Sequence, residues 1–290
     1  MPRTIDEGFR DFHEKLKIVN SESEAVKSHR ASIKACLENN FGMTNFFRTG
    51  SIGNGTNVNG YSDTDYFSVI PRENLSDNSI TSLRKVKEAL QTRFPSSNIY
   101  VDSPAVVVDF GSKASETTEI IPSDYMKTEN GVNIYDIPDT YGSWMKSSPM
   151  ANNKYVTQLN ESLGFKVKPL IRFIKAWKFY NNVPISSFYL EMRTAKYIST
   201  QDSIIYSIDI RDVFKYLIDI NLAKIIDPVG VGGYIDGLKT ENAKTETLSK
   251  LNTAYTRAVN AKSCENANNI SDSFYWWNLI FAEKFPSYYY

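Results

Sequence analysis

The stretch that decides the fold of this chain is Gly50-Ser-Ile-Gly-Asn-Gly-Thr-Asn-Val-Asn-Gly-Tyr-Ser-Asp-Thr-Asp65. Gly50 permits close approach of the backbone, and Ser51 supplies a hydroxyl and amide donors, as a phosphate-binding turn requires. If a strand begins at Asp63, its side chains alternate between two faces, so Asp63 and Asp65 point the same way. Two such carboxylates repel each other unless a cation lies between them, and hard oxygen ligands suit Mg²⁺ or Mn²⁺.

A third carboxylate is expected, because phosphoryl chemistry often uses two ions held about 4 Å apart. Asp109 is the best candidate, since it follows three consecutive valines in a run that is typical of a buried strand. That strand can lie beside the first and present Asp109 at the same edge. An Asp-x-Asp pair alone is more often a solvated turn or a calcium loop, so the prediction depends on the order and spacing of all these features.

This order of features resembles the polymerase-β-like nucleotidyltransferase superfamily, in which Gly-Ser, a spacer and an Asp-x-Asp pair form the signature. Thr64 replaces the aliphatic residue that usually stands between the acids. The resemblance implies an α+β fold: a nucleotidyltransferase core with a mixed β-sheet, plus a C-terminal helical lobe. It places the active site in the cleft between them and implies two Mg²⁺ or Mn²⁺ ions held by Asp63, Asp65 and Asp109.

The second half of the chain narrows the resemblance. The segments 170–178 (LIRFIKAWK) and 184–192 (PISSFYLEM) look like the helix pair shared by the oligoadenylate synthases, cyclic GMP-AMP synthase and their bacterial relatives, the CD-NTases. In these families a lysine on the first helix and a polar residue opening the second contact the triphosphate, and the next aromatic residue stacks on a base. The resemblance implies these roles for Lys175, Ser187 and Phe188, with Tyr189 as a substitute for stacking.

Each of these residues has an ordinary structural alternative. Lys175 flanks an apolar stripe and could be a solvated lysine. Ser187 could cap a helix, which is compatible with phosphate binding because a helix N-terminus attracts anions. Phe188 and Tyr189 are residue types more often found in a core than on a base platform. Glu191 is expected to brace the helix rather than to bind substrate.

A chain of 290 residues is expected to form two closely joined lobes, residues 1–150 with N-terminal backing helices and residues 151–290 mainly helical. The first lobe is expected to contain helices at about 5–19, 22–40 and 81–93, strands at 63–70 and 101–110, and a further strand through 119–122. The second is expected to contain helices at 153–163, 168–180, 187–197, 208–221 and 241–262. The aromatic run 274–277 is expected in the core, and Tyr288 to Tyr290 have no assigned role.

Composition limits the compartment and the site chemistry. With 290 residues and 41% hydrophobic content the chain can bury a substantial core. No apolar run approaches the roughly 20 residues of a membrane span, and no secretory segment follows Met1, so a cytoplasmic protein is expected. Two cysteines and two histidines lack the spacing of a disulfide framework or a zinc site.

Thirty-three basic and 33 acidic residues balance, which argues against a strong nucleic-acid surface. Nucleoside triphosphates, namely ATP, GTP or pyrimidine NTPs, are therefore the expected substrates. The resemblance implies condensation of NTPs into a cyclic dinucleotide or short cyclic oligonucleotide with release of pyrophosphate, in antiphage signalling through a separate effector protein. The alternative is a nucleotidyltransferase that modifies RNA, protein or a small molecule with the same metal site.

Overall fold

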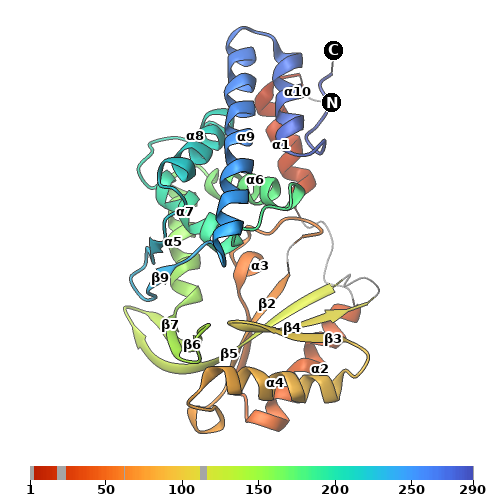
Figure 1. Cartoon of the computed structure of the whole chain (residues 1–290), viewed down its shortest axis with the longest axis vertical. Coiled ribbons are helices and arrows are strands. Elements are labelled where there is room, and N and C mark those ends of the chain that lie inside the picture. The colour runs from red at the N-terminus through yellow and green to blue at the C-terminus, as the bar shows by residue number, and fades with distance from the viewer. Residues whose placement is uncertain (1–2, 18–23, 62, 112–115, 290) are drawn as a thin grey trace.

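The computed structural model describes residues 3–17, 24–61, 63–111 and 116–289. Two lobes lie one above the other, with the β-sheet in one and most of the helices in the other (Figure 1). The sheet lobe contains these elements: α2 (Glu24–Phe41), β1 (Asn45–Arg48), α3 (Gly50–Asn54), β2 (Thr64–Val69), a 3₁₀ turn (Arg72–Asn74), α4 (Ser79–Arg93), β3 (Asn98–Asp102), β4 (Ala105–Phe110), β5 (Glu116–Glu129), β6 (Val132–Pro138) and β7 (Trp144–Ser147). The expected α+β fold with a mixed sheet is confirmed.

The sheet runs in the order β1-β2-β5-β4-β3, and β6 and β7 extend it from the far end of β5. Among the described strands of this sheet, β2 and β5 pair in parallel, and the other neighbours pair antiparallel. The prediction of one strand over 101–110 is wrong, because the chain turns at Ser103-Pro104 and forms the hairpin β3–β4. Proline has no amide hydrogen for a sheet ladder, so it stands at the turn.

Two helices, α2 and α4, cover one face of the sheet, which we call the back face (Figure 1). Their apolar side chains pack on those of the central strands, among them Leu37, Val86, Val106 and Ile120. Asp65 and Tyr66 are neighbours on β2, and their side chains leave opposite faces. The front face, with Asp65, looks toward the helical lobe, and the back face, with Tyr66, looks toward α2.

The helical lobe is built from α1 (Ile5–Leu16), α5 (Pro149–Ser162), α6 (Val167–Tyr180), α7 (Ser187–Ile198), α8 (Tyr206–Asp219), the short strands β8 (Ile225–Ile226) and β9 (Tyr234–Ile235), α9 (Glu241–Asn266) and α10 (Ile270–Ile280). Its helices agree with the expected ranges to within a few residues, except that α10 was not expected. No helix in the described ranges is both long and apolar enough to cross a membrane.

The first helix lies elsewhere than expected. It was predicted to back the sheet, but its buried stripe belongs to the core of the helical lobe. Phe9 packs against Phe173 and Trp277 with ring centroids 5.2 and 4.9 Å apart. Aromatic pairs of this kind contribute beyond the area they bury, so α1 ties the N-terminus to the second lobe. The end of the expected helix, residues 18–19, lies outside the described residues.

The aromatic run 274–277 is only partly in the core, because Tyr275 is exposed and Trp276 is partly buried. Phe274 and Trp277 are buried. Of the tyrosines without an assigned role, Tyr288 packs on Phe274 at 5.4 Å, and Tyr289 lies under the guanidinium of Arg3 at 5.2 Å. Residues 3 and 289 therefore lie next to each other on the helical lobe.

Candidate active site

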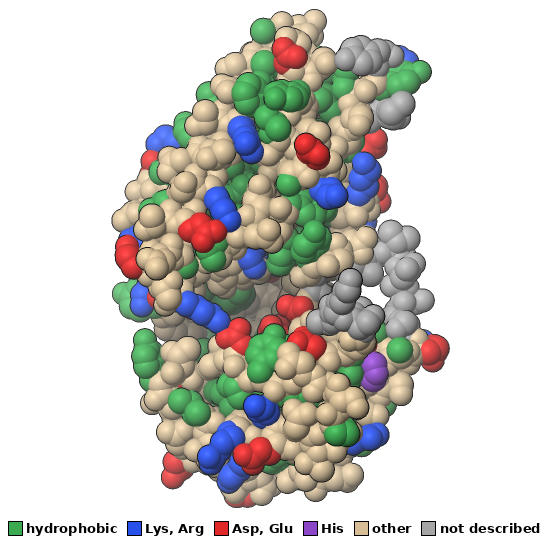
Figure 2. Space-filling model, turned by 45° about the vertical axis from the view of Figure 1, so that its right-hand side comes forward, with side chains coloured by type: hydrophobic (Ala, Val, Ile, Leu, Met, Phe, Trp, Pro, Cys, Tyr) green, Lys and Arg blue, Asp and Glu red, His purple; other side chains and the backbone are tan. Residues whose placement is uncertain are grey.

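A hollow separates the two lobes, and Asp and Glu side chains gather on its sheet-lobe wall (Figure 2). The turn at Gly50 lies against this acidic group. Gly50 has φ of +62°, and a Cβ atom there would lie 1.8 Å from Oδ2 of Asp65. The backbone is therefore so close to the carboxylate that only glycine fits at this position. The Thr49 amide donates to the Asp65 carbonyl at 2.9 Å, and the Ser51 amide donates to its carboxylate.

The strand register decides which acids meet. Asp65 pairs with Glu119 across β2 and β5, and Glu119 pairs with Val107 across β5 and β4. Directly paired side chains share a face, with neighbouring strands about 4.8 Å apart. Asp65 and Glu119 are therefore adjacent on the front face. The sequence analysis did not select Glu119, although an acid in the isoleucine-rich strand 119–122 was a signal for it.

Asp109 lies on the same face but in the next row. On β5, its register partner is Thr117. On the other side of β5, Asp63 comes directly before Thr64, the residue of β2 that pairs with Thr118. Asp109 accepts hydrogen bonds from the Thr117 hydroxyl at 3.1 Å and from the Asn98 amide at 2.9 Å. Thr117 thus stands between the strand of Asp109 and that of Asp63, whereas nothing separates Asp65 from Glu119.

The acids of the cleft hold protons more tightly than usual. Burial, followed by the charges of Asp65 and Asp63, raises the pKa of Glu119 to about 8. Burial also raises the pKa of Asp65 to about 6, and burial raises that of Asp63. Glu119 shares a hydrogen bond with Asp65 and is the natural holder of its proton. Like-charged groups placed together in this way are a mark of a functional site.

The chemistry of the donors fits a hard divalent cation. Asp63, Asp65 and Glu119 offer only carboxylate oxygens, the ligands that Mg²⁺ and Mn²⁺ prefer. A cation would also relieve the repulsion that raises their pKa values. Among the described residues, no group of three His, Cys, Asp or Glu side chains is already arranged to bind a metal ion. The hydrogen bond between Asp65 and Glu119 would have to open first.

Lys175 lies differently from the expectation that it faces phosphate. It is 2% exposed, and its ammonium pairs with the Glu191 carboxylate and donates to Thr56 Oγ1 at 3.0 Å. Glu191 also accepts from the Thr56 hydroxyl at 2.7 Å and from the Asn54 amide. The Lys175–Glu191 pair therefore connects the end of the 50–56 turn to the helical lobe through hydrogen bonds. Glu191 braces the structure, as expected.

Lys178, one turn further along α6, fits the predicted phosphate-contacting lysine better than Lys175 does. Its ammonium donates to Ser187 Oγ at 2.7 Å, and it interacts electrostatically with Asp63 and Glu119. Burial and the charge of Lys175 lower the pKa of Lys178 to about 8. Ser187 is the first residue of α7, and Ser186 is its N-cap. The sequence analysis missed Lys178, for which the spacing of three residues from Lys175 was the available signal.

The two candidate stacking residues, Phe188 and Tyr189, differ in solvent exposure. Phe188 is 44% exposed at the start of α7, beside Ser187. Tyr189 is fully buried, and its hydroxyl donates to the Ala223 carbonyl at 2.7 Å. The suggestion that Tyr189 substitutes as the stacking residue is therefore wrong, because the side chain faces the core of the helical lobe. Phe188 remains the candidate.

Comparison with known proteins identifies relatives of this chain. The profile of the Second Messenger Oligonucleotide or Dinucleotide Synthetase domain, SMODS, matches residues 3–160, more than half of the chain. The chain is also 25% identical over 232 residues to a Bacillus cereus protein named "Probable cyclic nucleotide synthase", covering 78% of this chain and 69% of that protein.

Solved structures share the fold over nearly the whole chain. Vibrio cholerae DncV, bound to the linear intermediate pppA(3′,5′)pG, superposes with a TM-score of 0.76 at 12% identity, covering 99% of this chain and 97% of that one. Escherichia coli CdnC with ATP gives 0.73 at 16% identity, covering 97% and 98%. This chain therefore belongs to the SMODS domain family of CD-NTases, the nucleotidyltransferases that synthesise cyclic nucleotide or oligonucleotide second messengers.

Proposed function

We propose that the cleft catalyses transfer of a nucleotidyl group between NTPs, with Asp63, Asp65 and Glu119 holding two Mg²⁺ or Mn²⁺ ions. The observation that carries this proposal is the adjacent pair of Asp65 and Glu119 against the Gly50 turn. Asp109, our first candidate for the third ligand, lies in the next row with its carboxylate occupied by Thr117 and Asn98. In this proposal Asp109 is a neighbouring negative charge, which adds to burial in raising the pKa of Asp63.

The donor triphosphate is proposed to lie between the 50–51 turn and the start of α7. Ser51 offers its hydroxyl, while Lys178 and Ser187 form a hydrogen-bonded pair that faces the acids from the opposite lobe. A lysine held at this position supplies a compact charge for phosphate oxygens. Lys175, whose charge is satisfied by Glu191, contributes by holding the turn in place, and Phe188 is proposed to stack on a base.

These residues act mainly by orientation. Bound divalent ions would polarise the attacking and leaving oxygens of an in-line displacement at the α-phosphate. Lys178 and Ser187 would align the triphosphate, and the Gly50 turn would keep Asp65 in place through backbone contacts. Fixing the ribose hydroxyl and the α-phosphate within reach of each other supplies a large part of the rate enhancement in such reactions.

The substrates and partners are proposed by analogy with the relatives. Solved relatives contain ATP in CdnC and GTP in DncV, so ATP and GTP are the first substrates to test. CdnC also forms a complex with a HORMA protein. For this chain we propose a cyclic dinucleotide or short cyclic oligonucleotide as product, detected by a separate effector protein in antiphage signalling.

The test is to incubate the purified protein with all four NTPs and Mg²⁺ or Mn²⁺, and to identify phosphatase-resistant products by mass spectrometry. Cyclic products and pyrophosphate are expected from the wild type and neither from a folded Asp63→Asn/Asp65→Asn variant. Equal turnover in that variant would contradict the proposed metal site. Label from NTPs that enters only added RNA, protein or a small-molecule acceptor would instead support the alternative transferase activity.

A further inference from the structure

The loop that leads from the glycine turn to the acid pair, residues 56–61, runs along the helical lobe. It contains no helix or strand, and it ends two residues before Asp63. Because β2 begins at Thr64, Asp63 precedes the ladder that joins this strand to β5. Asp65 lies inside that ladder and pairs with Glu119. The sheet therefore fixes Asp65, whereas the position of Asp63 depends on how the loop before it is held.

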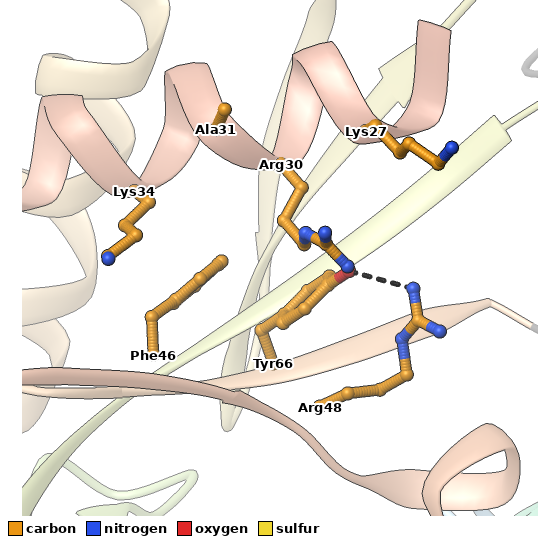
Figure 3. A pocket seen from close by; sticks show the side chains of 7 residues that line it. All are labelled: Lys27, Arg30, Ala31, Lys34, Phe46, Arg48 and Tyr66. Atoms are coloured by element: carbon orange, nitrogen blue, oxygen red, sulfur yellow. Dashed lines mark hydrogen bonds between the residues drawn. The ribbon is translucent and has the colours of Figure 1, made fainter. Parts of the chain in front are cut away.

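Contacts on the back face secure Asp65 further. The next residue, Tyr66, is buried on that face, and its hydroxyl accepts a hydrogen bond from Arg48 of β1 at 3.1 Å (Figure 3). Phe46, also on β1, stacks on the Tyr66 ring with centroids 4.5 Å apart. Ladder bonds and packing together hold this part of β2, so Asp65 does not depend on the 56–61 loop.

Helix α6 holds the loop near both of its ends. The Arg172 guanidinium donates through Nε to the Asn57 carbonyl at 2.9 Å. Two turns further along the helix, the ring of Phe179 stacks on that of Tyr61 with centroids 5.4 Å apart. Phe179 directly follows Lys178, the lysine proposed to bind phosphate. One rigid helix therefore carries both that lysine and two anchors of the loop.

Arg172 is itself held in place by α1. Its Nη1 donates to Nε2 of His13 at 2.7 Å. Burial, followed by the charge of Arg172, lowers the pKa of His13 to about 4, so the ring is neutral near neutral pH and can accept this bond. At the end of α1, the Leu16 carbonyl accepts from the Asn59 amide at 2.9 Å. Helix α1 thus contacts the loop both directly and through Arg172.

We propose that Arg172 and Tyr61 are positioning residues for Asp63: they hold the 56–61 loop against α6 and so place this carboxylate where it can bind a divalent cation. The donors of Arg172 go to a carbonyl and a neutral ring, an arrangement that fixes geometry rather than compensating charge. This role rests on the proposed function, because Asp63 is one of the metal ligands there. It adds α1, through His13, to the elements on which the metal site depends.

Binding of Mn²⁺ to the protein without nucleotide, measured from the EPR signal of free Mn²⁺, tests this role apart from turnover. Arg172→Lys keeps the charge but loses the planar donor group, and Tyr61→Leu removes an aromatic ring. Each should weaken Mn²⁺ binding about tenfold or more, as is usual when residues that orient metal ligands are changed. Asp63→Asn should weaken it at least as much.

Matched controls place the same substitutions away from the loop. Arg257→Lys changes an arginine that donates to the Leu279 carbonyl at 2.7 Å, between α9 and α10. Tyr275→Leu removes an exposed tyrosine ring that contacts Trp276. Both controls should bind Mn²⁺ as wild type does. Losses in the controls equal to those in Arg172→Lys and Tyr61→Leu would overturn the positioning role.

The variants also separate failure of this role from failure of the proposed function. If Arg172→Lys and Tyr61→Leu bind Mn²⁺ as wild type does while Asp63→Asn does not, the positioning role is overturned and the metal site stands. If Asp63→Asn also binds as wild type does, the proposed metal site fails as well. Should Arg172→Lys not fold, Tyr61→Leu decides alone, because Tyr61 is 44% exposed and its loss leaves the core intact.

The Mg²⁺ dependence of turnover is a readout that a merely structural role would not move. In Arg172→Lys and Tyr61→Leu, the Mg²⁺ concentration for half-maximal pyrophosphate release should rise about tenfold, and the KM for NTP at saturating Mg²⁺ should stay within about twofold of wild type. A kcat that falls equally at every Mg²⁺ concentration, with an unchanged midpoint, would overturn the assignment.

Discussion

Two pairs of ionisable side chains flank the 50–56 turn, and they differ in how their charge is compensated. At one end, Asp65 and Glu119 are both acids and lie side by side at the cleft. At the other end, Lys175 and Glu191 are of opposite charge and are buried together with Thr56 and Asn54. A cation could relieve the electrostatic repulsion between Asp65 and Glu119, whereas the opposite charges of Lys175 and Glu191 already compensate each other. The uncompensated pair is therefore the candidate for chemistry, and the compensated pair for architecture.

The largest expected effect comes from the uncompensated pair. Glu119→Gln should lower turnover by about 10³-fold or more, since loss of a metal ligand forfeits several kcal/mol of charge stabilisation. Asp109→Asn, which keeps its size and lies in the next row, should lose about tenfold or less. Steady-state pyrophosphate release measures both. A greater loss in Asp109→Asn would restore Asp109 as the third ligand.

The compensated pair should reveal itself in stability. Glu191→Gln leaves the buried Lys175 ammonium without its counter-charge, which costs about 3–5 kcal/mol of the free energy of unfolding. The control Glu246→Gln breaks the exposed pair with Lys250, 2.6 Å long, and should cost about 1 kcal/mol or less. Urea unfolding of both variants checks this. Similar small losses would show that the buried pair does not brace the turn.

The two lysines of α6 extend the comparison. Lys178→Met should raise the KM for NTP by about 10–100-fold, because a charge-assisted phosphate contact is worth about 1.5–3 kcal/mol. Its melting temperature should change little, since Lys178 is only half-buried. Lys284→Met, beyond α10 on the helical lobe, is a matched control with unchanged KM. An unchanged KM in Lys178→Met would remove this lysine from the phosphate site.

A further expected effect is the pH dependence of the metal-free protein. The raised pKa of Glu119, about 8 against an ordinary 4.5, means that the folded state binds a proton that the unfolded state has lost at neutral pH. This contribution to stability is complete below about pH 4.5 and is lost as pH rises toward 8. In EDTA, the melting temperature of wild type should therefore fall relative to Glu119→Gln over that range. A constant difference would mean that Glu119 holds no extra proton.

Much of the fold followed from local patterns. The ranges of α6, α7 and β2 agree with the expected ones to within one residue at either end, because apolar periodicity and helix starts depend on neighbours in sequence. The strand predicted over 101–110 failed at Pro104, a local signal that was present. The placement of α1 failed for another reason: its apolar stripe fits either core, and only packing against Phe173 and Trp277 selects one.

The sequence by itself determined the glycine turn, the Asp63 and Asp65 pair and the family, because these depend on residue type and spacing along one segment. Only the tertiary structure decided which distant groups meet them. Strand register brought Glu119 beside Asp65 and set Asp109 one row away. Packing buried Lys175 in an ion pair with Glu191 and placed Lys178 near the acids of the cleft. Register and burial arise from contacts between segments far apart in the chain, which no local pattern encodes.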